Sequence, residues 1–253
     1  MNYYLLLVPL SFLSVAMSSH KHYKASIKIS STGLPTNQTT NLITTTEAPP
    51  DTSTIKDKVE LKLFYETLCP ASVRFYVDQL VPAVKRFGTH MDVHLVPYGG
   101  ATTYNALGSY FFRCQHGVEE CNRNMFHACS VDVLANVTHA ILFNSCLMQR
   151  TSADDLDYSA SMTMCTLREN VSRQNLDDIL ACTNGTRGPE LMKSFGEETW
   201  DLKIRYVPYL LLDGSARNQR KARKNLKDTI CEMLIPRVAE CGYTSQRSKH
   251  SRH

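Results

Sequence analysis

Nine cysteines in a chain of 253 residues constrain its fold and chemistry more than any other feature. Cysteines pair as disulfides in the secretory pathway, whereas in the cytosol they usually stay reduced or bind metal. Because nine is an odd number, at least one of them stays outside any pair within the chain. The first questions are therefore in which compartment the chain folds and which cysteine is left over.

The N-terminus favours the secretory pathway. Residues 5–17 form an apolar stretch that is too short to cross a bilayer but fits the central region of a signal peptide, which we expect to span residues 1–17. No later apolar stretch is long enough for a transmembrane helix, so we expect no membrane association. Four N-glycosylation sequons agree with this route and begin at Asn37, Asn136, Asn170 and Asn184. We therefore predict a secreted or lysosomal glycoprotein with most cysteines in disulfides.

Composition divides the rest of the chain into three parts. Residues 18–57 are rich in Ser and Thr and poor in large apolar side chains, so we expect a flexible segment there. An ordered domain is expected over residues 58–242, followed by a flexible basic tail at 243–253. A second basic run, at 217–227, has no aromatic side chains interleaved to stack on bases. We interpret both basic segments as solvated surface and expect no nucleic acid partner.

Periodic apolar residues predict how the ordered domain begins. Apolar and polar residues alternate over 59–65, which predicts a strand. Apolar residues then recur at helical spacing over 73–84, so a helix is expected to begin at Pro70, where the first turn tolerates a proline. Residues 91–97 predict a second strand. A strand–helix–strand unit of this kind normally places its two strands parallel in one sheet.

The remaining segments complete an α/β fold. A region at about 101–200 holds six cysteines and is expected to be mostly helical. It is followed by a predicted strand at 206–214 and a predicted helix at about 218–234. This order of elements fits a thioredoxin-like fold that is interrupted by an inserted, disulfide-bonded helical subdomain.

Cys69 is the candidate for the cysteine that is left over. It lies between the first predicted strand and the helix, and the start of a helix presents unpaired N–H groups and a partial positive charge that favour the thiolate. The thiolate is the form that attacks a disulfide sulfur. A dithiol reductase would carry a second thiol three residues later, but this chain has Ser72, which can donate a hydrogen bond and cannot form an internal disulfide. On this motif alone, an ordinary cysteine at a helix start is the alternative.

Pro208 strengthens the functional interpretation of Cys69. It follows Val207 directly before an apolar strand. In thioredoxin-like folds, a cis-proline at this place packs beside the active-site cysteine, and the exposed backbone there pairs with the substrate chain. We therefore expect Pro208 to be cis and to belong to the catalytic site with Cys69 and Ser72.

A cluster of Cys and His residues opens the middle region. Taken alone, the mixture could indicate zinc, but disulfides are expected in a secreted chain and no metal site is predicted. The spacing resembles the signature of the gamma-interferon-inducible lysosomal thiol reductase family. That signature is Cys-Gln-His-Gly, two variable residues, Glu-Cys, two more, Asn, four more and Cys, and here it is formed by Cys114, Gln115, His116, Gly117, Glu120, Cys121, Asn124 and Cys129.

The resemblance extends over roughly residues 58–242 and includes the segments 95–99, 182–188 and 206–209. It implies a thioredoxin fold with a helical insertion, and reduction of protein disulfides at acidic pH in lysosomes. Some members are secreted, and their activity is linked to antigen processing and host defence. Family enzymes with demonstrated reductase chemistry carry Cys-x-x-Cys, so Ser72 is a departure from the family pattern.

These observations together predict a thiol–disulfide oxidoreductase that acts on disulfide-bonded proteins by monothiol exchange at Cys69. No bound cofactor is expected, and an external small thiol such as cysteine or glutathione would serve as reductant. The other cysteines form an even set, and spacing alone does not choose their pairing. These structural disulfide candidates are Cys114, Cys121, Cys129, Cys146, Cys165, Cys182, Cys231 and Cys241.

Two alternatives stay open at this point. The first is a secreted binding protein that keeps the thiol reductase fold without turnover and has a host-defence role. The second is a structural glycoprotein in which Cys69 is capped or linked to another chain. We expect a monomer, with a mixed-disulfide dimer through Cys69 as the alternative.

Overall fold

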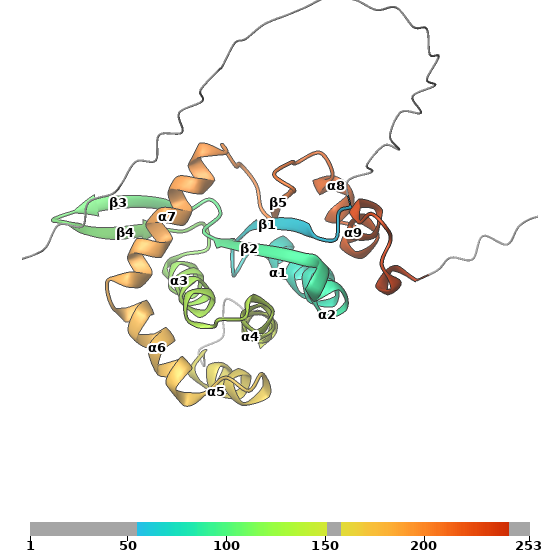
Figure 1. Cartoon of the computed structure of the whole chain (residues 1–253). Helices are drawn as coiled ribbons and strands as arrows, with labels where there is room; N and C mark the ends of the chain where they lie inside the picture. Colours follow the sequence, from blue (N-terminus) through green and yellow to red (C-terminus); the bar gives the residue numbers. More distant parts are fainter. Residues whose placement is uncertain (1–54, 151–157, 243–253) are drawn as a thin grey trace, which may run out of the picture. The chain divides into compact units, whose positions relative to one another are not determined.

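The computed structural model describes residues 55–150 and 158–242 (Figure 1). The predicted signal peptide, the basic tail, Asn37 and nearly all of the Ser/Thr-rich segment lie outside the described residues. Within the described ranges, no helix has both the length and the apolar character that crossing a membrane requires.

A three-stranded sheet in the order β2–β1–β5 lies at the centre of the fold (Figure 1). Strand β1 (Val59–Tyr65) is parallel to β2 (Met91–Pro97) and antiparallel to β5 (Tyr209–Leu212). The bounds of β1 and β2 are those predicted from the sequence. Strand β5 is shorter than the predicted 206–214 and begins only after Pro208, which has no N–H to donate to a neighbouring strand.

Both faces of β1 are buried at its C-terminal end. Leu63 and Tyr65 pack against the helices that follow β1, whereas Phe64 packs with Val96 and Met192 on the other face. Parallel strands are normally covered on both faces in this way. The chain therefore leaves β1 from the interior of the molecule, and the next residues begin in a largely dehydrated environment.

A long helical segment follows β1 and packs against the face of the sheet that carries Leu63 and Tyr65. It comprises α1 (Pro70–Phe75), a π-helical turn (Tyr76–Leu80) and α2 (Val81–Phe87), with a short 3-10 turn (Gly88–His90) before β2. Pro82 has no N–H to donate to the preceding turn, and the irregular π turn ends at Leu80, two residues before it. The buried apolar side chains of this segment are Phe75, Tyr76, Leu80, Ala83, Val84 and Phe87.

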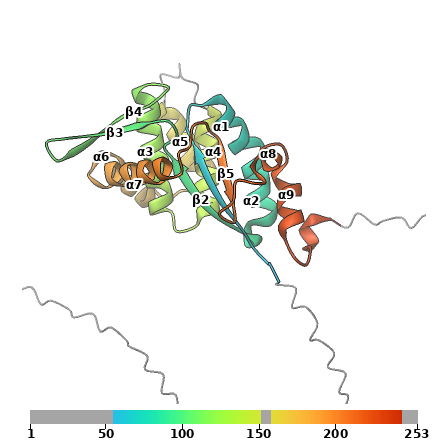
Figure 2. The ribbon, with the colours of Figure 1, turned by 90° about the horizontal axis from the view of Figure 1, so that it is seen from above.

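The inserted region is helical only after an initial β-hairpin. Its hairpin consists of β3 (Thr102–Ala106) and β4 (Ser109–Arg113), and its helices are α3 (Val118–Val133), α4 (Val137–Arg150), α5 (Tyr158–Arg168), α6 (Arg173–Asn184) and α7 (Arg187–Asp201). Most hairpin side chains are exposed, so no apolar alternation predicted these strands. The hairpin projects away from the central sheet in both views (Figures 1 and 2).

The prediction of a single helix over about 218–234 is wrong. The structure has two shorter helices there, α8 (Gln219–Ala222) and α9 (Leu226–Met233), followed by a 3-10 turn (Ala239–Cys241). The break occurs because the side chain of Asn225 accepts a hydrogen bond from the Asp228 N–H at 3.2 Å and so starts a new helix.

Four disulfides use eight of the nine cysteines. The Cys114–Cys121 bond joins the end of the hairpin to α3, and Cys231–Cys241 joins α9 to the last 3-10 turn. The other two lie within the apolar core of the insertion, where Cys129–Cys182 links α3 to α6 and Cys146–Cys165 links α4 to α5. The insertion is therefore cross-linked through its own core.

The disulfide with the longest loop should contribute most to stability. Cys129 and Cys182 are 53 residues apart, and replacing both with alanine should lower the free energy of unfolding by about 4 kcal/mol, because the unfolded chain regains the entropy of an open loop. The matched control removes Cys231 and Cys241, which are 10 residues apart, and should cost about 3 kcal/mol. Urea unfolding would measure both values, and a larger loss in the control would contradict the argument.

Candidate active site

Cys69 lies where β1 has ended and α1 begins. It is half-buried, and all other cysteines of the chain are in disulfides. Cys69 is the N-cap residue of α1, its carbonyl accepts a hydrogen bond from the Val73 N–H at 2.9 Å, and Pro70 occupies the first helical position. The first N–H groups of this helix donate no hydrogen bond to the side chain of its N-cap residue. They and the helix dipole favour negative charge at the place where Cys69 lies.

Ser72 faces the interior and not the solvent. Its residue surface is 1% exposed, and its Oγ accepts a hydrogen bond from the Glu66 N–H at 3.4 Å. Among the residues that the structure describes, no hydrogen bond joins Ser72 to Cys69. The Ser72 hydroxyl therefore supports the loop before Cys69.

Pro208 and the start of α1 line one small cavity. The Val207–Pro208 peptide bond is cis, as predicted, and Pro208 is buried. The cavity has a volume of about 250 Å³, and Ala71, the second residue after Cys69, lines it together with Pro208. The structure thus brings the beginning of β5 close to the helix that starts at Cys69.

Glu66 is a buried carboxyl group that the sequence analysis missed. It is the third residue before Cys69, it is 1% exposed, and its Oε1 accepts a hydrogen bond from the Gly100 N–H at 2.7 Å. Gly99 has a positive φ of 62°, and a Cβ at this position would collide with the Glu66 side chain, so only glycine fits. A charged residue directly after a buried strand was the available signal in the sequence.

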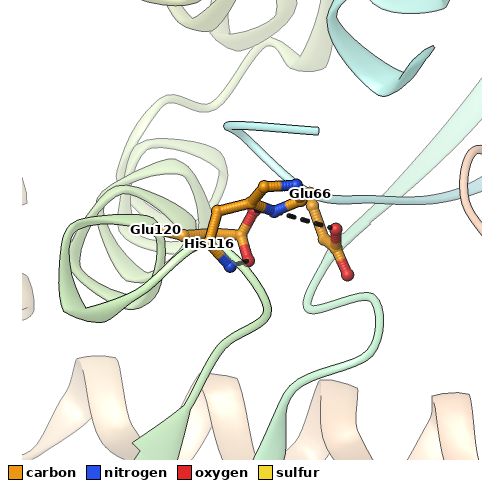
Figure 3. Close-up of side chains that lie close together, drawn as sticks. All are labelled: Glu66, His116 and Glu120. Atoms are coloured by element: carbon orange, nitrogen blue, oxygen red, sulfur yellow. Dashed lines mark hydrogen bonds and ion pairs between the residues drawn. The ribbon is translucent and has the colours of Figure 1, made fainter. Parts of the chain in front are cut away.

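His116 and Glu120 of the signature converge on Glu66 (Figure 3). The Nδ1 of His116 lies 2.5 Å from Oε2 of Glu120 and 3.5 Å from Oε2 of Glu66. The backbone N–H of His116 donates to Oε1 of Glu120 at 3.1 Å, and Glu120 is fully buried. Burial raises the pKa of the Glu66 carboxyl to about 6; the negative charge of Glu120 also raises it, while the Gly100 N–H and His116 oppose the shift.

Asn124, another signature residue, holds the residue after Glu66. Both the backbone N–H and the Oγ1 of Thr67 donate hydrogen bonds to Oδ1 of Asn124, at 3.0 and 2.8 Å. Asn124 is fully buried, so these bonds are shielded from water. The signature residue Asn124 of α3 therefore holds Thr67, which lies two residues before Cys69. His116, just before α3, lies 3.5 Å from the carboxylate of Glu66, three residues before Cys69.

Similarity to known proteins decides the family of this chain. A family model described as gamma interferon inducible lysosomal thiol reductase (GILT) matches residues 60–170. The gamma-interferon-inducible lysosomal thiol reductase of Carassius auratus is 31% identical over 198 residues, which cover 76% of this chain and 76% of that relative. The chain belongs to the GILT family. A GILT-like protein of Anopheles gambiae is 30% identical over 200 residues, covering 74% of this chain and 81% of the relative.

GILT family membership makes the chain one of the thiol–disulfide oxidoreductases. The matched range, residues 60–170, contains Cys69 and Ser72 as well as His116, Glu120 and Asn124, so these residues of the site lie within the family region. Among solved structures, reduced DsbA1 from Neisseria meningitidis is similar at 13% identity, with a TM-score of 0.44 and coverage of 70% of this chain and 86% of that chain. The strand–helix–strand unit, helical insertion, cis-proline strand and final helices give this GILT family chain its thioredoxin-like fold.

Two buried groups near this site should affect stability in opposite directions as the pH falls. Burial, assisted by Arg123, lowers the pKa of His127 to about 3, whereas the unfolded value is near 6.5. Acid therefore protonates His127 in the unfolded chain first, which should cost about 2 kcal/mol of stability between about pH 7 and pH 5. The pKa of Glu66 is raised, so its protonation should stabilise the folded state by about 1 kcal/mol over the same range.

The His127→Gln variant tests this balance. When the pH is lowered from about 7 to about 5, the variant should gain about 2 kcal/mol in free energy of unfolding relative to the unsubstituted protein, because it lacks the group that acid protonates in the unfolded chain. Glu66→Gln should change in the other direction by about 1 kcal/mol. Denaturant unfolding at both pH values gives these differences, and equal pH dependence of all three proteins would contradict the assigned shifts.

Proposed function

We propose that this chain reduces disulfides of protein substrates by thiol exchange at Cys69, with an external small thiol as the final reductant. The Cys69 thiolate attacks one sulfur of the substrate disulfide and forms a mixed disulfide, and the other substrate sulfur leaves as a thiolate. A small thiolate then attacks the Cys69 sulfur and releases the second substrate cysteine. A second small thiol restores Cys69 and leaves as the oxidised small-molecule disulfide, so two electrons pass to the substrate.

The observation that supports this proposal most strongly is the isolation of Cys69. It is the one free cysteine of a GILT family chain, and it caps the helix that follows β1. Ser72 has no sulfur with which to resolve the mixed disulfide, which is why the proposed cycle needs an external thiol. The exchange would occur beside the cis-Pro208 strand, where a substrate chain could pair with the backbone.

We place this activity in the secretory pathway, in lysosomes or outside the cell. The apolar stretch at 5–17 and the four disulfides support this location. The sequon residues Asn136, Asn170 and Asn184 are all exposed and thus accessible to the glycosylation machinery.

Reduction of insulin tests the proposal. The full chain is assayed at about pH 5 and about pH 7, with and without added cysteine or glutathione. We expect reduction that exceeds the rate of the thiol alone, and only where the small thiol is present. If the protein forms complexes with disulfide substrates but does not accelerate their reduction at either pH, the alternative of a binding protein that keeps the fold without turnover is favoured.

A further inference from the structure

We infer that Glu66, His116 and Glu120 form a binding site for a divalent transition-metal ion such as Zn²⁺. The three side chains come from the loop after β1, the segment before α3 and the first turn of α3 (Figure 3). One ligand atom from each lies within 4.8 Å of the others. Imidazole nitrogen together with carboxylate oxygen is a donor set that zinc commonly uses.

An unsatisfied oxygen points to a missing ligand. Oε2 of Glu66 is buried and has no hydrogen-bond donor among the described residues. Nδ1 of His116 lies 3.5 Å from it, but that nitrogen is already engaged by Glu120 at 2.5 Å. A single N–H cannot serve both carboxylates well, and a buried oxygen without a partner is costly. A cation between the three groups would satisfy all of them.

The two carboxylates are oriented for such an ion. In each carboxylate, Oε1 accepts a hydrogen bond from a backbone N–H. The Gly100 N–H donates to Glu66 at 2.7 Å, and the His116 N–H donates to Glu120 at 3.1 Å. Each Oε2 is thereby left for the centre of the cluster. Hydrogen bonds of this kind hold the ligands of metal sites in place.

The distances from His116 to the two carboxylates can be compared with those of a zinc site. Zinc lies about 2.0–2.2 Å from nitrogen and oxygen ligands, so two ligands of one tetrahedral ion are roughly 3.4 Å apart. The separation of 3.5 Å between His116 and Glu66 already fits, whereas the His116–Glu120 pair at 2.5 Å must open by roughly 1 Å as the ion replaces the shared proton. The His116 side chain is 36% exposed, which gives the ion a path from solvent and leaves room for water as a fourth ligand.

Zinc titration of the full-length protein tests the site. Isothermal titration calorimetry near pH 7 is performed in a Cys69→Ser background, so that the free thiol does not compete for the ion. We expect one site whose affinity falls at least about tenfold in Glu66→Gln and in Glu120→Gln. The matched control is His94→Ala, because His94 pairs with Glu198 on the surface at 3.3 Å and Lys62 binds the same carboxylate. Affinities that are equal in all four proteins would overturn the inference.

A second measurement does not depend on the stability of the variants. Co²⁺ is added to the otherwise unsubstituted Cys69→Ser protein, and the ring signals of its histidines are followed by NMR. The His116 ring should show paramagnetic shifts at the first equivalent of Co²⁺, before those of the surface residue His94. Shifts that begin at His94 or at histidines of the chain termini, with His116 unaffected, would show that the cluster binds no metal.

Discussion

The Cys69→Ser variant is expected to lose all insulin reduction above the rate that the added small thiol gives alone. A serine hydroxyl cannot form the mixed disulfide through which the proposed exchange passes, and no described cysteine is free to replace it. The substitution exchanges one atom at a half-buried helix cap, and serine is itself favoured at such positions. Thermal unfolding should therefore be nearly unchanged, which separates loss of chemistry from loss of fold.

Ser72→Ala is the matched control for that experiment. It removes the neighbouring hydroxyl but keeps the thiol, so thiol-dependent reduction should persist. Loss of activity in Ser72→Ala, or its survival in Cys69→Ser, would contradict the role assigned to Cys69.

The Ser72→Cys variant should gain the ability to finish one round of reduction without an added thiol. Positions 69 and 72 lie one helical turn apart, at about 5 to 6 Å between Cα atoms, which is within the range for a disulfide. Fully reduced Ser72→Cys protein should release about one equivalent of reduced substrate and form a disulfide between Cys69 and the introduced thiol. The unsubstituted protein should instead stop at the mixed disulfide.

Non-reducing mass spectrometry of a single-turnover mixture would distinguish these outcomes. Accumulation of the same mixed disulfide in both proteins would contradict the prediction. The new sulfur enters a buried position whose hydroxyl bonds the Glu66 N–H, so a stability loss of about 1 kcal/mol is expected alongside the gain. Comparison with Ser72→Ala separates the loss of that hydrogen bond from the effect of the larger atom.

The sequence predicted the parts of the fold that depend on local patterns. Strands β1 and β2 were found because their apolar residues face a buried core, and the helix start at Pro70 because proline fits the first helical turn. The hairpin β3–β4 was missed since its side chains are mostly exposed and show no alternation. The break between α8 and α9 depends on the single cap at Asn225, which a periodicity of four apolar residues does not reveal.

The surroundings of Cys69 were less predictable because they depend on contacts between distant segments. Cys69 and Pro208 could be recognised from their positions next to a helix and a strand. That His116 and Glu120 meet Glu66, which lies 50 residues or more before them in the chain, follows only from the packing of α3 against the sheet. The signature spacing predicted a family, and the structure adds which loop these residues hold.

The most direct test of the account is to identify which sulfur reacts with a small disulfide. The full-length protein is incubated with oxidised glutathione, and the adduct is located by intact mass and peptide mapping under non-reducing conditions. The account predicts one glutathione per chain, bound at Cys69, removable by free thiol, with all four internal disulfides preserved. A chain that stays unmodified at Cys69, or that carries glutathione at another cysteine, would contradict the claim that Cys69 is the working thiol.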